Sequence, residues 1–189
     1  MEKTIDDART LLRQHLKENF LLLHSRETEV IMRALAKRLG EDEELWAITG
    51  LLHDLDFEEM KETPEQHGLK TCEILEQEGF YDPAMLHAIK AHNESHIAAE
   101  VSRESKLDFC LAAAENITGL IVAYVLMKPD KKLEGTKVKS ITKKLKDKSF
   151  AANVNREYIN DIEKAGTERS EFIELAIAAM TEIADELGF

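Results

Sequence analysis

The sequence has few of the residues that mark secreted or membrane-spanning proteins. Its 189 residues include only two cysteines and three prolines. Cys72 and Cys110 lie far apart and form no CxxC pair, so we expect no disulfide framework and a reducing, cytoplasmic location. The first ten residues, MEKTIDDART, lack the apolar segment of a signal peptide. We also expect no membrane span, because no run approaches the roughly 18 uncharged apolar residues that one needs.

Positive charge is scarce as well. The chain has 25 lysines and arginines against 37 aspartates and glutamates, a formal net charge of −12. Because an acidic molecule is repelled by anionic surfaces, we expect neither a nucleic acid nor a membrane as partner. Hydrophobic residues make up 43% of the chain, which excludes a disordered protein and suffices for one buried core.

The apolar residues predict an all-α fold. They recur at steps of three and four, alternating strand patterns are hard to find, and neither a linker nor a repeat divides the chain. We therefore expect one helical-bundle domain over residues 1–189, with eight or nine helices. The expected helices lie near 5–16, up to Gly40, 45–53, 64–78, 83–92, 106–127, 136–148, 153–165 and 168–187.

Three of these helices have clear start signals. Thr63 followed by Pro64 and Gln66 has the spacing of a capping box with proline at the first helical position. Asp82 before a proline repeats the pattern, and Ser105 begins the helix that runs to about residue 127. That helix is apolar nearly all round, so we expect it to be buried between others.

The seven histidines of the chain are the residues that indicate a function. Several predicted helices each contribute one or two imidazole or carboxylate groups, which is how helical bundles build metal sites. Neutral imidazole suits transition metals, and a carboxylate can bridge two ions. We therefore expect one or two divalent ions of iron, manganese, nickel, cobalt or zinc. The candidate ligands are His24, His53, Asp54, His67, His92 and Glu115.

Each candidate also has a simpler interpretation. His53 and Asp54 would serve equally to end a helix and start a turn, and His67 and His92 would serve as surface histidines. Asp108, seven residues before Glu115 and on the same helical face, competes with it as a ligand. The remaining histidines are expected to be structural or exposed; they are His15, His87 and His96.

The order of these residues along the chain, with the segments around them, resembles the HD-domain superfamily of metal-dependent phosphohydrolases, in particular its small stand-alone members. The resemblance rests on LLLHSRETEV, WAITGLLHDLDFE, PEQHGLKTCEIL, AIKAHNE, LAAAENITGLIVA and KSFAANVNRE. It implies that His24, His53 and Asp54 are the first three metal ligands and that His67 and His92 hold a second ion. The domain core would span about 20–127, with the helices of about 136–187 packed on it.

Two positions depart from the family pattern. Glu115, in AAENITG, stands where the family usually has an aspartate, and the extra methylene moves the carboxylate by about one bond length, a large change for a metal ligand. Asp56 stands where many members have the glycine of the HDIG signature.

The resemblance implies hydrolysis of a nucleotide or another phosphate ester by metal-activated water. The substrate would be a small phosphorylated molecule, cleaved as a monoester or a diester. Asp54 would bridge two ions, and Asp56 or Glu58 would relay protons. A regulatory domain that binds metal or nucleotide without catalysis is an alternative, favoured by Glu115. A di-iron oxygenase is another alternative, and a homo-oligomer stays open.

The segment 128–148 is the only basic one, with nine lysines against three acids and a local charge of +6. An amphipathic helix with Val138 and Ile141 facing inward would simply place these lysines in solvent. Alternatively, Lys139, Lys148 or Arg156 approaches the active-site mouth and binds a substrate phosphate.

Overall fold

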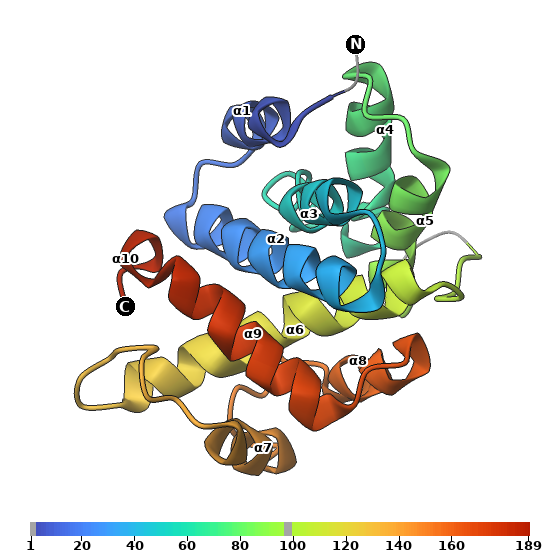
Figure 1. Ribbon diagram of the computed structural model, residues 1–189. Coiled ribbons are helices and arrows are strands. Elements are labelled where there is room, and N and C mark those ends of the chain that lie inside the picture. The colour runs from blue at the N-terminus through green and yellow to red at the C-terminus, as the bar shows by residue number, and fades with distance from the viewer. Residues whose placement is uncertain (1–2, 97–99) are drawn as a thin grey trace.

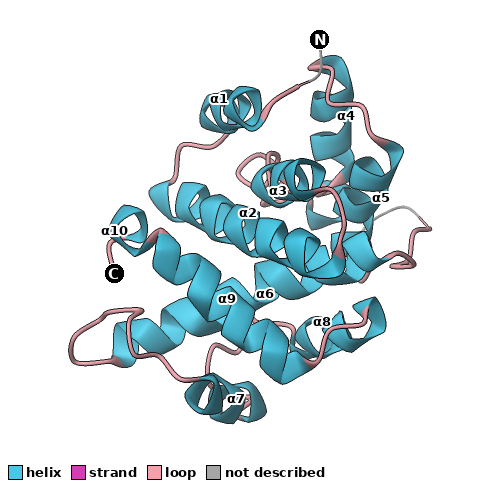
Figure 2. Cartoon of the chain, in the orientation of Figure 1, coloured by secondary structure: helices cyan, strands magenta, loops and turns pink. Residues whose placement is uncertain are grey.

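The computed structural model describes residues 3–96 and 100–189, and every regular element within them is helical (Figure 2). The all-α prediction is therefore confirmed for this part of the chain, with ten α-helices rather than eight or nine. They are α1 (Ile5–His15), α2 (Asn19–Leu39), α3 (Glu43–Leu52), α4 (Leu69–Gln77), α5 (Pro83–His92), α6 (Lys106–Met127), α7 (Val138–Lys146), α8 (Arg156–Asn160), α9 (Arg169–Glu182) and α10 (Ala184–Leu187), with 3-10 turns η1 (Pro64–Gln66) and η2 (Asp161–Ala165).

The larger number arises near the C-terminus. The helix expected over 153–165 is the short α8 followed by η2, and the one expected over 168–187 is interrupted at Ile183, which leaves the helical conformation between α9 and α10. Just before the break, the Thr181 hydroxyl donates to the Ile177 carbonyl at 2.7 Å. Such a bond to the preceding turn weakens and bends a helix.

Local capping explains several helix boundaries. Ser105 and Asp108 form the capping box that starts α6, and the Asp82 carboxylate accepts hydrogen bonds from the first turn of α5. Gly40 ends α2 in the left-handed conformation, with φ of +73°. These predicted signals are confirmed.

The predicted start of the fourth helix is wrong. The Thr63 side chain makes no capping hydrogen bond, and α4 begins only at Leu69. Its first turn is capped by Asp56, whose Oδ2 accepts the N–H of Gly68 at 2.9 Å and that of Thr71 at 3.0 Å. A cap supplied from another segment leaves no mark in the sequence around the helix start.

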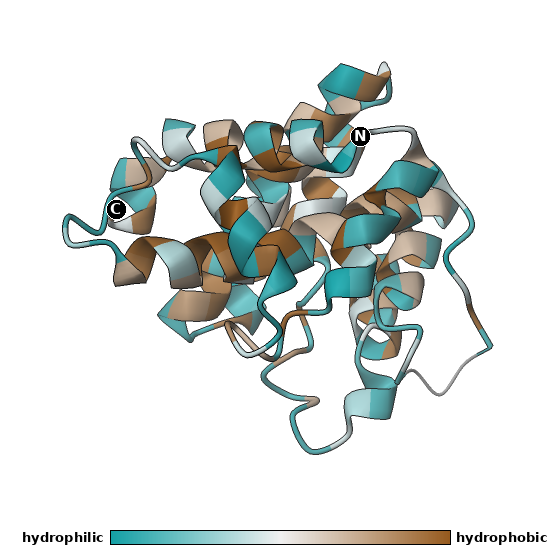
Figure 3. Ribbon diagram, turned by 90° about the horizontal axis from the view of Figure 1, so that it is seen from below, coloured by the Kyte–Doolittle hydropathy of each residue, from teal (hydrophilic) through white to brown (hydrophobic). Residues whose placement is uncertain are grey.

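Helix α6 is the centre of the bundle. It contacts α2, α5, α7, α8 and α9, and in Figure 1 it lies between α3 and α4 on one side and α7 on the other. Helix α9 also packs on α2, so the C-terminal helices lie against the segment that carries His24. Figure 3 shows hydrophobic residues concentrated on the helices in the middle and hydrophilic ones on the surrounding loops.

By length and composition alone, α6 is apolar enough to cross a membrane, although it carries Lys106, Asp108 and Glu115 and has no run of 18 uncharged residues. In this fold it is the core helix, and nearly all side chains from Leu107 to Ile121 are buried by its neighbours.

Both cysteines are buried and free. Cys72 lies in α4 and Cys110 in α6. Burial raises the pKa of the Cys72 thiol to about 12 and raises that of Cys110 as well. The prediction that they form no disulfide is confirmed.

Candidate metal centre

Four histidines and one aspartate converge from three helices and one loop. His24 projects from α2, His53 and Asp54 follow α3, His67 follows η1, and His92 ends α5. They form two groups, each with its ligand atoms within 4.8 Å of one another. The first group is His24, His53 and Asp54; the second is Asp54, His67 and His92.

The Asp54 carboxylate is the shared member. Its Oδ2 lies 3.7 Å from Nε2 of His24, and its Oδ1 lies 3.3 Å from Nε2 of His53. The same Oδ1 is 3.2 Å from Nε2 of His67 and 3.5 Å from Nε2 of His92. One carboxylate thus faces the same nitrogen of four imidazoles, as a bridging ligand between two ions does.

The opposite nitrogen of each ring is held by a hydrogen-bond acceptor. The Nδ1 atoms of His24, His53, His67 and His92 lie 2.5–3.0 Å from Thr118 Oγ1, the Gly50 carbonyl, Asp56 Oδ1 and the Ile89 carbonyl, respectively. In a neutral imidazole, an acceptor at Nδ1 fixes the proton there and leaves the Nε2 lone pair free for a metal.

The His24 contact is set by a second bond. The Thr118 hydroxyl donates to the Glu115 carbonyl at 2.7 Å, so its oxygen is left to accept the Nδ1–H of His24. Nε2 of His53 is buried and has no hydrogen-bond partner among the described residues. A buried nitrogen without a partner is costly, and a metal ion would satisfy it. The donor set therefore fits a transition metal.

A close helix contact brings the first group together. A Cβ at Gly50 of α3 would lie 2.8 Å from the Thr28 carbonyl and 2.9 Å from the Met32 side chain on α2. Only glycine allows this approach. As a result, the rings of His24 and His53 have their centroids 5.3 Å apart.

Burial and the charge of Asp54 have opposite effects on the pKa values of the clustered histidines. Burial lowers the pKa of His53 to about 3 and also lowers that of His24, against the opposing charge of Asp54. Burial acts in the same direction on His67, but the hydrogen bonds that its ring donates to Asp54 and Asp56 outweigh burial and raise the pKa to about 10. For Asp54, the neighbouring imidazoles outweigh burial and hold its pKa well below the usual range.

Asp56 is placed as a support for a ligand. Its Oδ1 accepts the Nδ1–H of His67 at 2.6 Å, and its Oδ2 is used by the α4 backbone. Both oxygens are thus engaged in holding structure, whereas the sequence suggested a proton relay.

Glu58 lies outside the cluster. Its Oε1 accepts the backbone N–H groups of Lys17 and Glu18, at 2.8 and 2.7 Å, in the connection between α1 and α2. These bonds lower the pKa of Glu58.

Glu115 is adjacent to the cluster but belongs to neither group. Its Oε1 accepts from the Asn116 side-chain amide. Burial, followed by the charge of Asp54, raises the pKa of Glu115 well above its usual range. The competing Asp108 is engaged elsewhere, because its Oδ2 accepts two backbone N–H groups and lies 3.1 Å from Nδ1 of His87.

The basic candidates do not gather at the cluster. Lys139 and Lys148 are exposed, and α7, which carries Lys139, lies across α6 and α9 from α3 (Figure 1). The Arg156 guanidinium donates to backbone carbonyls of the preceding loop, including those of Ala151 and Val154.

Two contributors could not be found from the sequence. Thr118 holds His24 through a contact that spans 94 residues. Arg103, whose side chain is 6% exposed, lies 2.7 Å from Glu94 and 3.1 Å from Asp161, and stacks 3.8 Å from the centre of the Tyr158 ring. Its charge opposes the rise in the pKa of Glu115. His15 and His96 lie outside both groups, as expected.

Comparison with known proteins gives a family match over the part of the chain that carries the cluster. The family model of the HD domain matches residues 21–124, just over half of the chain, and this range contains all five clustered residues. Comparison with curated proteins and with solved structures gives no match. The all-helical fold, the converging His and Asp side chains and the family match together identify the chain as a member of the HD-domain superfamily of metal-dependent phosphohydrolases.

Proposed function

We propose that the chain hydrolyses a small phosphorylated molecule, a nucleotide or another phosphate ester, with one or two divalent transition-metal ions held by the five clustered residues. One observation carries the proposal: four imidazoles, each fixed at Nδ1, direct Nε2 toward one carboxylate. A purely structural histidine cluster has no need of four fixed tautomers of the same kind.

The protein supplies positions and charge. His24, His53 and Asp54 would hold one ion, and Asp54, His67 and His92 a second one. A divalent ion at such a site lowers the pKa of a coordinated water and polarises a phosphoryl oxygen. Thr118 and Asp56 keep two of the imidazoles in the ligating orientation. Cytoplasmic location is part of this proposal.

A regulatory, non-catalytic domain is the second candidate, and a specific observation favours it. Each acidic residue expected to transfer protons, Asp56 or Glu58, has one carboxylate oxygen bound to two backbone N–H groups, and Asp56 has its other oxygen bound to His67. Glu115 lies outside both groups. A site that binds a metal without an available proton carrier would serve as a sensor.

Metal analysis and a substrate screen distinguish the two candidates. The purified protein is expected to contain a transition metal and, with Mn²⁺, Ni²⁺ or Co²⁺ added, to release phosphate from members of a panel of mono- and diesters. His53→Ala and Asp54→Ala should lose metal and activity while remaining helical. His15→Ala, which removes an imidazole outside the cluster, is the matched control.

The outcomes are separable. Stoichiometric metal without any hydrolysis across the panel favours the regulatory domain, and two irons with oxygen consumption favour an oxygenase. Unchanged metal content in both His53→Ala and Asp54→Ala would refute the site.

A further inference from the structure

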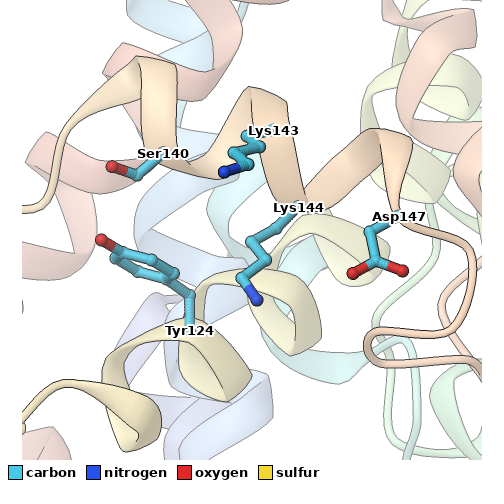
Figure 4. Close-up of a pocket in the computed structure, with 5 residues that line it drawn as sticks. All are labelled: Tyr124, Ser140, Lys143, Lys144 and Asp147. Atoms are coloured by element: carbon cyan, nitrogen blue, oxygen red, sulfur yellow. The ribbon is translucent and has the colours of Figure 1, made fainter.

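A hollow lies between the C-terminal part of α6 and α7, away from the clustered histidines. Its volume is about 330 Å³, and Figure 4 shows the side chains that line it. Tyr124 projects from α6 on one side, and the remaining four residues come from α7 and its C-cap on the other. The lining residues are Tyr124, Ser140, Lys143, Lys144 and Asp147.

The sequence of α7 produces this polar wall. Ser140, Lys143, Lys144 and Asp147 follow at steps of three, one and three, which places them along one face of a helix. The neighbouring face, with the buried Ile141 and Leu145, packs on the protein core. The amphipathic helix expected from the sequence is therefore present, and its polar face is opposite Tyr124.

The hollow is rich in hydrogen-bond donors that lack acceptors. Among the described residues, none forms a hydrogen bond or ion pair with the Tyr124 hydroxyl, the Ser140 hydroxyl or the Lys143 ammonium group. In Figure 4 the two hydroxyl groups, one from each helix, lie at the same end of the hollow. The Lys144 Nζ lies 4.2 Å from the centre of the Phe150 ring, a contact that leaves its N–H groups available.

The one acidic residue of the lining is partly engaged. Asp147 Oδ1 accepts the Ser149 hydroxyl at 2.6 Å and the Ser149 N–H at 3.1 Å, which lowers the pKa of this carboxyl group. The lining therefore has two ammonium groups and two hydroxyls but a single carboxylate, and all of these except the Tyr124 hydroxyl belong to the segment 128–148, which carries +6 in a chain of −12.

The hollow is separate from the metal centre. Tyr124 follows Glu115 by nine residues, which corresponds to about 14 Å along the helix axis and about two and a half turns. The two side chains thus leave α6 on opposite sides. An anion bound beside Tyr124 would not contact the clustered histidines.

We propose that this hollow binds the phosphate group of a small soluble anion at a site independent of the metal centre. Phosphate supplies several acceptor oxygens to the two hydroxyls and the two ammonium groups of the lining, and lysine binds it as a point charge. A hollow of this volume has room for the phosphate group of a small metabolite.

The test uses pyrophosphate as the probe, titrated by calorimetry into the full chain in the presence of a chelator that keeps the metal centre empty. Wild type should bind, and Lys143→Gln/Lys144→Gln should bind at least about tenfold more weakly, a loss of about 1.4 kcal/mol. Lys137→Gln/Lys146→Gln makes the same change in net charge at two exposed lysines outside the hollow and should bind within about twofold of wild type.

Further variants keep the result interpretable if the double variant unfolds. Tyr124→Phe removes only a hydroxyl and should weaken pyrophosphate binding by a few-fold. In wild type, the NMR signals of the backbone amides of residues 138–147 should shift when pyrophosphate is added. His53→Ala should bind pyrophosphate as wild type does, because the metal centre takes no part.

Three results would overturn the proposal. The first is an equal loss of pyrophosphate affinity in both lysine double variants, which would indicate diffuse charge attraction. The second is loss of pyrophosphate binding in His53→Ala, and the third is absence of pyrophosphate binding by wild type. Sedimentation with phosphatidylglycerol vesicles, but no binding of pyrophosphate, would assign the lysines to a lipid surface instead.

Discussion

The Asp56 carboxylate connects the start of a helix to a candidate metal ligand. One oxygen accepts the Nδ1–H of His67 at 2.6 Å, and the other accepts two N–H groups at the beginning of α4. The orientation of an imidazole and the position of a helix N-terminus are therefore set by the same side chain. This position is a glycine in the HDIG signature that the sequence resembles.

Asp56→Ala is expected to affect both features. Metal affinity should fall about 10- to 100-fold because His67 loses the acceptor that orients it. The free energy of unfolding of the metal-free protein should fall by about 1–3 kcal/mol because buried N–H groups lose their acceptor. Metal titration and urea denaturation measure the two effects. Glu58→Gln, a change in an acid that lies outside the cluster, should leave metal affinity unaltered, and an equal loss in both variants would contradict this role for Asp56.

Metal binding should release a proton near neutral pH. The pKa of His67 is raised to about 10 in the metal-free cluster, so this imidazole is protonated at pH 7 and 8, whereas a ligand must be neutral. Apparent metal affinity should therefore rise about tenfold per pH unit over this range. Calorimetry in buffers of different ionisation enthalpy counts the protons. If metal binding at pH 8 releases no proton, His67 is already neutral or is not a ligand.

Glu27 should make the folded state less stable as the pH rises. Burial raises its pKa to about 8, from an ordinary value of 4.5, so the folded protein retains a proton that the unfolded chain has lost between these values. Stability due to this group is complete below pH 4.5 and declines by about 1.4 kcal/mol per unit as the pH rises toward 8. Glu27→Gln should remove this slope and be the more stable protein at pH 8.

Urea denaturation of wild type and Glu27→Gln at several pH values measures the difference. Glu174→Gln makes the same change at an exposed position of α9 and should follow the wild-type profile. If Glu27→Gln and wild type have parallel profiles between pH 5 and pH 8, the buried carboxyl group does not titrate as described.

Glu115 is tested by shortening and by neutralising its side chain. If the pocket has adapted to glutamate, Glu115→Asp should weaken metal binding about tenfold or more, because close-packed interiors respond to a single methylene. If glutamate is one methylene too long, the same change should raise affinity or turnover. Should Glu115→Asp and Glu115→Gln both leave metal affinity and turnover unchanged, Glu115 is not a ligand, in line with its position outside both groups.

Sequence reasoning succeeded where the signal was local. The starts of α5 and α6 follow from Asp82 and Ser105. The expectation that several helices each contribute an imidazole or a carboxylate to one cluster agrees with the two groups found. Sequence reasoning failed where a contact joins distant segments. The cap of α4 comes from Asp56, and Glu58 is bound 40 and 41 residues away, at Glu18 and Lys17.

The basic segment illustrates the same limit. Its charge and its amphipathic helix are visible in the sequence, but which lysines line a hollow depends on how α7 lies against α6. The structure places Lys143 and Lys144 there, while Lys139 and Lys148 are exposed outside its lining.

The rates at which a thiol reagent modifies the two buried cysteines report which part of the protein unfolds locally. Cys72 lies in the helix that begins just after His67, with its Sγ 3.3 Å from the Leu86 carbonyl, and Cys110 lies in the central helix. A thiol reagent reaches Cys72 when α4 detaches, whereas it reaches Cys110 only when the core opens. Loading the histidines with metal should therefore slow alkylation of Cys72 more than that of Cys110, so the rate of thiol labelling reports ligand binding without any engineered probe.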